Sequence, residues 1–73
     1  MMYSAKRKKI EWLTEELKKE VDEKKTLQID ISKTQKYKGL SMGVWEDSLS
    51  MLEAHGYRIS YDPLKKTAKI MAV

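Results

Sequence analysis

Cysteine is absent from the chain, and proline and histidine occur once each among 73 residues. Without cysteine the protein has no disulfide, no thiol nucleophile and no thiolate ligand for a metal. No segment approaches the ~20 consecutive apolar residues of a membrane span, and residues 1–9 lack the apolar core of a secretion signal. These absences predict a soluble, cytoplasmic protein that has no membrane partner.

The length allows one small domain, residues 1–73. Charged residues make up 36% and hydrophobic ones 41%, a mix typical of a folded domain rather than a disordered tail. A chain of this size buries only about 60% of its unfolded surface, so a partner or a dimer would add stability. The net charge of +4 is compatible with an anionic partner.

Residues 1–25 are expected to form one helix, with Ser4 as its N-cap. Its apolar side chains recur at helical spacing and form a narrow stripe, which comprises Tyr3, Ile10, Leu13, Leu17 and Val21. This stripe is also a candidate seam for a homodimer. Trp12 lies nearly opposite the stripe, about 200° from Ile10. Trp12 is either a docking residue, as exposed tryptophans often are, or is covered by neighbouring stems or a loop.

A basic run stands near the start of this helix and consists of Lys6, Arg7, Lys8 and Lys9. The helix dipole disfavours cations at this end. That small penalty favours a functional interpretation, an N-terminal basic arm that contacts phosphates. The alternative is a solvated first turn.

Residues 26–32 alternate between apolar and polar side chains, with Leu27, Ile29 and Ile31 on one face, which predicts a half-buried strand. Residues 33–40 form a short basic connector with room for a single helical turn. A second helix is expected from Ser41, its N-cap, to His55, with Gly56 ending it. Its core-facing arc is predicted to comprise Val44, Trp45, Ser48, Leu49, Met51, Leu52 and His55.

A C-terminal β-hairpin is expected after Gly56, because apolar residues alternate on both sides of an Asp62-Pro63 turn. The inward-facing residues are Tyr57, Ile59, Tyr61, Ala68, Ile70 and Ala72. The predicted fold class is a small α+β domain in the order helix, strand, short helix, helix, strand, strand. Residues 1–25 form its N-terminal helix, and residues 26–73 form the remaining unit.

The reactive side chains argue against an enzyme. His55 falls in the last turn of a helix, where it suits the dipole, and no nucleophile or carboxylate stands at a spacing that would orient it. One histidine without cysteine, and no acidic loop of calcium-binding type, predict no metal site. Gly39 and Gly43 do not form a phosphate loop. We therefore expect no catalytic residue and no cofactor.

The chain from Lys38 onward resembles the latter half of a winged helix-turn-helix DNA-binding domain. In that family a Gly-Leu-Ser-like turn, here residues 39–41, opens the recognition helix. The helix ends in a Leu-Glu-x-x-Gly-Tyr phrase, here residues 52–57, and a two-stranded wing follows. The preceding strand also falls in the family's order, so the resemblance extends over residues 26–73. It implies a winged-helix-like unit that binds duplex DNA.

The solvent face of the expected recognition helix is acidic, with Glu46, Asp47 and Glu53 and no lysine or arginine. Carboxylates oppose the phosphate field that dominates affinity for DNA, so contacts from the flanks are expected instead. The candidate DNA-binding residues are Lys33, Lys36, Tyr37, Lys38, Arg58, Lys65, Lys66 and Lys69. The alternative is that these lysines only solubilise turns and strand edges.

Two functions remain open. The first is a small non-enzymatic DNA-binding protein, a transcription regulator of the kind that phages or other mobile elements encode. The second is an inhibitor or adaptor that docks on a protein partner through helix surfaces, with Trp12, Glu46, Asp47 and Glu53 as its candidate contacts. The acidic face distinguishes them: if exposed, it argues against insertion into a DNA groove.

Overall fold

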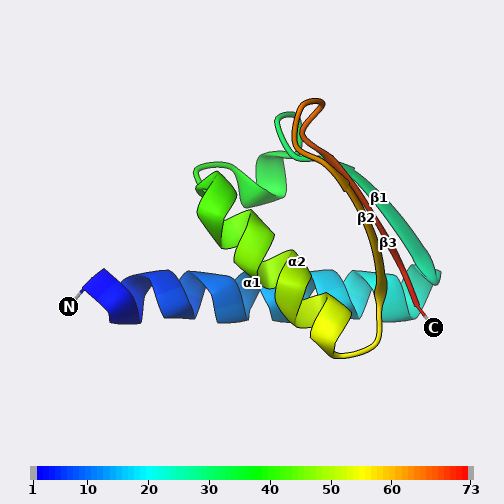
Figure 1. The fold of residues 1–73 in the computed structure, drawn as a ribbon, viewed down its shortest axis with the longest axis horizontal. Helices are drawn as coiled ribbons and strands as arrows, with labels where there is room; N and C mark the ends of the chain where they lie inside the picture. Colours follow the sequence, from blue (N-terminus) through cyan, green and yellow to red (C-terminus); the bar gives the residue numbers. More distant parts are fainter. Residues whose placement is uncertain (1, 73) are drawn as a thin grey trace.

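Two helices pack on one side of a three-stranded antiparallel sheet in the computed structural model, which describes residues 2–72 and the side chains of residues 5–72 (Figure 1). The elements are α1 (Met2–Lys24), β1 (Thr26–Asp30), the 3-10 turn η1 (Gln35–Tyr37), α2 (Met42–Ala54), β2 (Arg58–Asp62) and β3 (Thr67–Met71). The predicted α+β class and element order are confirmed. Within residues 2–72, no helix has the length and apolar character needed to cross a bilayer.

The sheet has the strand order β1-β3-β2, so the last strand of the chain lies in the centre. Both pairings are antiparallel, and the register places Ile70 between Leu27 and Ile59. Side chains alternate between the two faces of a sheet, so this row points toward the helices while the next row, Gln28, Lys69 and Ser60, points to solvent. The predicted alternation therefore holds within the strands as observed, residues 26–30, 58–62 and 67–71.

The apolar stripe of α1 packs into the core of its own domain. Leu13, Leu17 and Val21 are fully buried, and they belong to one core cluster with residues of α2 and of the sheet. Ile10 of the same stripe is only partly buried, and the side chain of Tyr3 lies outside the described residues. The core therefore uses the part of the stripe from Leu13 to Val21, and a homodimer seam along this helix stays a prediction.

The core-facing arc of α2 is narrower than predicted. The buried residues of this helix are Val44, Trp45, Ser48, Leu49 and Leu52. Met51 and His55, which the sequence pattern placed in the same arc, are exposed. The prediction was wrong for these two because α1 covers Met51 only in part, with the Thr14 hydroxyl 4.0 Å from its sulfur, and because His55 lies at the C-cap, beyond the last residue of α2.

Local hydrogen bonds set where the elements begin and end. The Ser41 hydroxyl accepts a hydrogen bond from the Val44 amide at 3.3 Å, which confirms the predicted N-cap of α2. Helix α1 begins at Met2, earlier than a cap at Ser4 would place it, and the side chain of Ser4 lies outside the described residues. Strand β1 ends at Asp30, two residues earlier than expected, because Asp30 Oδ1 accepts from the amide and hydroxyl of Ser32 and turns the chain.

Gly56→Ala is expected to lower the free energy of unfolding by about 1–2 kcal/mol, because a Cβ is disfavoured in left-handed backbone. Gly56 follows α2 with a φ of +99°, and a Cβ there would meet no atom within 4 Å, so the backbone alone is responsible. Gly43→Ala is the matched control, and urea denaturation measures both. Gly43 lies inside α2 with ordinary contacts, so alanine there is expected to stabilise by about 0.5–1 kcal/mol. Equal effects at both sites would contradict the prediction.

Candidate nucleic-acid interface

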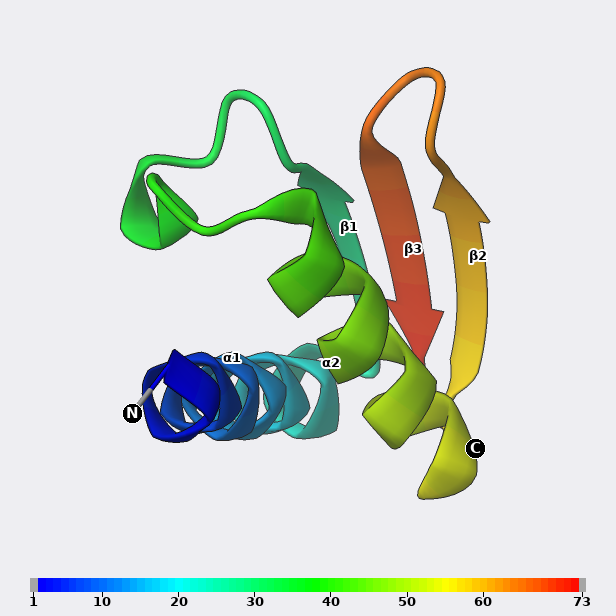
Figure 2. The ribbon, with the colours of Figure 1, turned by 60° about the vertical axis from the view of Figure 1, so that its left-hand side comes forward.

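Two turns from distant parts of the sequence lie together at one end of the sheet. The Ile31 amide, just after β1, donates a hydrogen bond to the Lys66 carbonyl in the β2–β3 turn at 2.8 Å. Asp62 Oδ1 holds the β2–β3 turn by accepting from the amides of Leu64 at 3.0 Å and Lys65 at 3.2 Å. Figure 2 shows both loops projecting past the same end of the strands.

Four lysines lie in or next to these two turns and the connector, and we call this set the basic end: Lys33, Lys38, Lys65 and Lys66. All four are exposed, and Lys38 and Lys66 line one hollow that also contains Thr34, Gln35 and Ser41. Leu64 projects from the hairpin turn with 94% of its surface exposed. The basic end thus combines cations, hydroxyl and amide groups, and one exposed apolar side chain.

Two carboxylates at the turns of the basic end accept hydrogen bonds from those turns. Asp62 caps the hairpin turn, and Asp30 accepts from Ser32. The hydrogen bond from the Ser32 hydroxyl is the largest of the effects that hold the pKa of Asp30 below its usual value. These carboxylates shape the two turns, while the lysine side chains remain directed to solvent.

Tyr37 is a core residue and not a surface contact. Its side chain is 3% exposed, and its ring packs edge-on against Trp45 at 5.4 Å and against Trp12 at 5.8 Å between centroids. The connector is too short to form a regular helix, so this aromatic anchors it to the body. Tyr37 is therefore removed from the candidate nucleic-acid contacts.

Lys36 is directed away from the other connector lysines. Its Nζ makes a salt bridge with Glu20 of α1 at 3.1 Å and lies 5.5 Å from the Tyr37 ring centroid. The hydrogen bond to Glu20 is the main reason that the pKa of Lys36 is raised. Glu20 therefore offsets part of the Lys36 charge. Lys33 also has a carboxylate neighbour, since its charge is one of the effects that lower the pKa of Asp30.

The remaining basic candidates do not join the basic end. Arg58 pairs with Met71 at the opposite end of β2, and Lys69 lies in the middle of the outer sheet face. In the N-terminal run, Lys6 makes an ion pair with Asp47 at 3.8 Å and Arg7 with Glu11 at 3.3 Å. Lys8 and Lys9 are exposed farther along α1.

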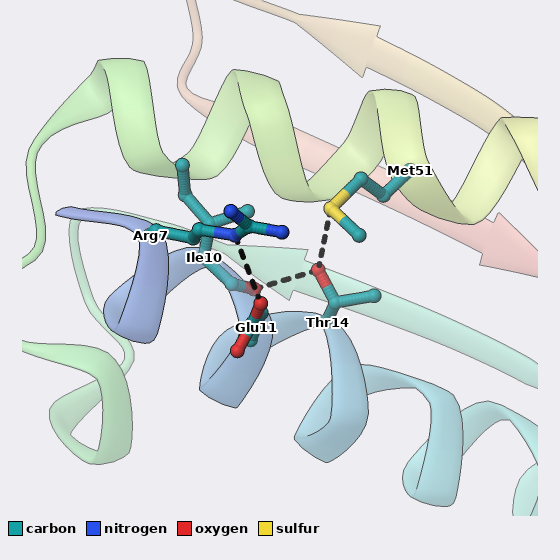
Figure 3. Close-up of polar contacts among 5 residues, drawn as sticks. All are labelled: Arg7, Ile10, Glu11, Thr14 and Met51. Atoms are coloured by element: carbon teal, nitrogen blue, oxygen red, sulfur yellow. Dashed lines mark hydrogen bonds and ion pairs between the residues drawn. The ribbon is translucent and has the colours of Figure 1, made fainter. Parts of the chain in front are cut away.

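Contacts between the two helices lie just after this basic part of α1. The Thr14 hydroxyl donates to the Ile10 carbonyl at 2.7 Å and lies 4.0 Å from the Met51 sulfur (Figure 3). The buried Ser48 hydroxyl reaches the same carbonyl at 3.2 Å. The contacts of Thr14 with Met51 and of Ser48 with Ile10 join α2 to α1, so the basic run precedes a part of α1 that is packed against α2.

The acidic face of α2 is exposed in the folded chain. Glu46, Asp47 and Glu53 all face solvent. Glu46 accepts a hydrogen bond from the Tyr61 hydroxyl at 3.3 Å, and Asp47 makes its ion pair with Lys6. Nothing on this helix surface would favour approach to phosphates, so the exposed face argues against insertion of α2 into a groove.

Trp12 is 44% exposed, and the covered part of its ring contacts Tyr37. The connector therefore covers part of Trp12, which agrees with the interpretation that a loop covers this residue. Docking on a partner through the exposed part of the ring stays a prediction. Sequence reasoning missed Leu64. An apolar residue between a Pro-initiated turn and two lysines was the available signal for an exposed hairpin tip.

Within residues 2–72, no group of three histidine, aspartate or glutamate side chains is arranged to hold a metal ion. No family model, curated protein or solved structure matches the chain. The fold defines a small α+β domain whose two helices and three-stranded antiparallel sheet are compatible with a winged-helix-like arrangement.

Tyr37→Phe is expected to leave the free energy of unfolding unchanged or to raise it by about 1 kcal/mol. The substitution keeps the ring contacts and removes a buried hydroxyl that has no hydrogen-bond partner. Tyr37→Ala is expected to lower the free energy of unfolding by about 3–5 kcal/mol, because it leaves a cavity between two tryptophans. Urea denaturation followed by tryptophan fluorescence measures both. A marked loss of stability in Tyr37→Phe would show that Glu20, which lies near the hydroxyl, bonds it.

Stability is expected to fall above pH 10, because folding raises the pKa of three tyrosines. The causes are a hydrogen bond to Asp22 for Tyr57, 2.6 Å long, and mainly burial for Tyr37 and Tyr61. When folding raises the pKa of a tyrosine, the fold is stabilised at pH values below the pKa of the unfolded chain, about 10. This stabilisation is lost as the pH rises through the higher pKa of the folded chain. Thermal unfolding between pH 8 and 11 checks this. Tyr57→Phe should flatten the dependence, and an unchanged slope would contradict the assignment to Tyr57.

Proposed function

We propose that this protein binds duplex DNA through phosphate contacts made by the basic end. The observation that carries the proposal is the hydrogen bond between the Ile31 amide and the Lys66 carbonyl. This bond joins the turn after β1, which leads into the connector, to the hairpin turn, so that the two turns form one surface. Lysines that are scattered in the sequence thereby act on the same stretch of phosphate backbone.

The composition of the basic end suits the phosphate backbone of a duplex. Lysine ammonium groups neutralise phosphates and release counterions, which gives affinity without sequence preference. Hydroxyl and amide side chains in the hollow, such as Thr34 and Gln35, are suited to phosphate and sugar oxygens. Leu64 at the hairpin tip has the apolar character of side chains that enter a minor groove. Binding to many duplex sequences with a steep dependence on salt is the expected behaviour.

We further propose that the domain is of winged helix-turn-helix type, with β2 and β3 as its wing and η1 in the position of the second helix. The order of elements and the C-terminal hairpin support this assignment. The exposed carboxylates of α2 oppose groove insertion, so this domain would bind through its wing and connector.

Binding to a protein is a second candidate function, favoured by a different surface. A hollow between α1 and α2 has Ile10 and Met51 as apolar lining and charged residues of both signs at its rim. Met51 is 38% exposed, and methionine adapts to varied partner surfaces. This hollow is separate from the basic end, so the two functions are tested by different substitutions.

Lys65→Ala combined with Lys66→Ala is expected to weaken binding to all duplex sequences. The slope of log affinity against log salt should fall by nearly two units, at ~0.9 per phosphate contact. Fluorescence anisotropy with a random-sequence duplex, titrated at several salt concentrations, measures both quantities.

Lys19→Ala combined with Lys24→Ala is the matched control. It removes the same charge from exposed positions on α1, outside the basic end, and is expected to leave the salt slope unchanged. No binding of the natural chain at low salt would overturn the proposed function. Equal losses in the two double variants would attribute the binding to net charge and remove the basic end from the mechanism.

A further inference from the structure

Strand β2 is an edge strand of the sheet. The strand order β1-β3-β2 leaves one side of β2 unpaired, and Figure 2 shows no helix or strand beyond it. Natural edge strands are commonly protected by short length, by charged side chains (lysine above all), by proline, by a bulge or by a covering element. Residues 58–62 read Arg-Ile-Ser-Tyr-Asp: the strand is short and has a charge at each end, but it contains neither proline nor lysine, and Pro63 comes only after it. This edge is able to pair with another strand.

The sequence of β2 is complementary to itself when it is read in the opposite direction. In an antiparallel pairing of two copies centred on Ser60, Arg58 faces Asp62 of the second copy, and Ile59 faces Tyr61. Opposite charges and aromatic–β-branched pairs are the combinations that stabilise directly opposed positions. We propose that a second copy of this chain pairs with β2 about a two-fold axis through Ser60, which joins the two sheets into one of six strands.

The charged pair lies on the outer face of the sheet. Arg58 is exposed, and among the described residues it makes no salt bridge. The hydrogen bonds described for Asp62 both use Oδ1, which caps the hairpin turn, so its Oδ2 is directed to neither turn amide. Two-fold symmetry produces this Arg58–Asp62 contact twice, once at each end of the seam.

The apolar pair lies on the inner face, beside α2. Ile59 and Tyr61 are only half-buried, and they line a shallow hollow between α2 and β2. The α2 side of this hollow consists of Leu49, Ser50 and the carboxylates of Glu46 and Glu53. The Tyr61 hydroxyl is already held by Glu46, which fixes the ring at the edge. A second β2 in this position would set its own Tyr61 beside Ile59 and cover the apolar part of the hollow.

The other edge of the sheet lacks this complementarity. Strand β1 reads Thr-Leu-Gln-Ile-Asp, and its self-pairing about Gln28 would place Thr26 opposite Asp30 with no cation available. Complementary charges therefore favour β2, and not β1, as the strand that pairs with a second copy of the chain. The pairing directs the two hairpin turns to opposite ends of the joined sheet, so each basic end stays uncovered and the dimer does not depend on the proposed DNA binding.

Ser60→Glu and Gln28→Glu form a matched pair of variants. Both positions are exposed, both flank Lys69 in the same row of the sheet, and both gain one negative charge beside that lysine. Only Ser60 lies on the proposed axis, where two carboxylates would face each other directly, and like charges in that position destabilise pairing.

Sedimentation equilibrium of the natural chain and the two variants, from about 10 μM to 1 mM, covers the weak affinity expected for so short a seam. The natural chain and Gln28→Glu are expected to dimerise alike, and Ser60→Glu to weaken dimerisation roughly tenfold or more. Circular dichroism confirms that each variant is folded. A natural chain that stays monomeric at the highest concentration would overturn the proposal, as would equal dimerisation by both variants.

Cysteine substitution gives a second measurement, because the natural chain contains no cysteine. Ser60→Cys places two thiols directly opposite each other across the axis, whereas Gln28→Cys places them on the far edges of the joined sheet. With a short thiol-reactive cross-linker, Ser60→Cys is expected to give a covalent dimer much faster than Gln28→Cys. Equal rates of cross-linking would place the contact elsewhere and overturn the pairing.

Discussion

The burial of Trp45 is the interaction on which most of this small fold depends. Trp45 is the largest fully buried side chain, and it belongs to the core cluster in which the two helices meet the sheet. Tyr37 packs edge-on against it and Trp12 packs against Tyr37, so three aromatic rings connect α2, the 3-10 turn and α1. Because the connector has little regular structure, this contact holds it to the body of the domain and thereby positions Lys33 and Lys38.

The distribution of charge follows from the same packing. The connector and the hairpin turn come together at one end of the sheet through the bond between Ile31 and Lys66, and both turns carry lysines. One acidic residue of each helix accepts a hydrogen bond from a tyrosine near or within β2: Tyr57, just before the strand, donates to Asp22, and Tyr61 donates to Glu46. The result is a basic end and an acidic helix face on separate parts of the surface, which is why the proposed DNA contact does not use α2.

The unpaired edge of β2 is a third surface, separate from the basic end and from the acidic face of α2. A domain of 73 residues has a small core, and association is one way in which such chains gain stability. Leu13, Leu17 and Val21 of the α1 stripe are buried in the core, whereas β2 keeps an unpaired edge with complementary side chains. Association through this edge would leave the basic end and the hollow between the helices open to other partners.

The sequence by itself determined the elements, because periodicity and capping are local properties. Spacings of three and four residues defined α1 and α2, alternation defined the strands, and Ser41 and Gly56 marked the ends of α2. The acidic face of α2 and the lysines of the basic end could also be identified in this way, as side chains of known charge on known elements.

Only the tertiary structure decided which neighbours these elements have. Alternation tells which residues share a face but not which strand lies beside it, so the central place of β3 and the free edge of β2 could not be inferred. For the same reason Tyr37, interpreted as a surface aromatic among lysines, proved to be buried, and Met51 proved to be exposed. Burial depends on what covers a side chain, and here the covering residues lie far away in the sequence.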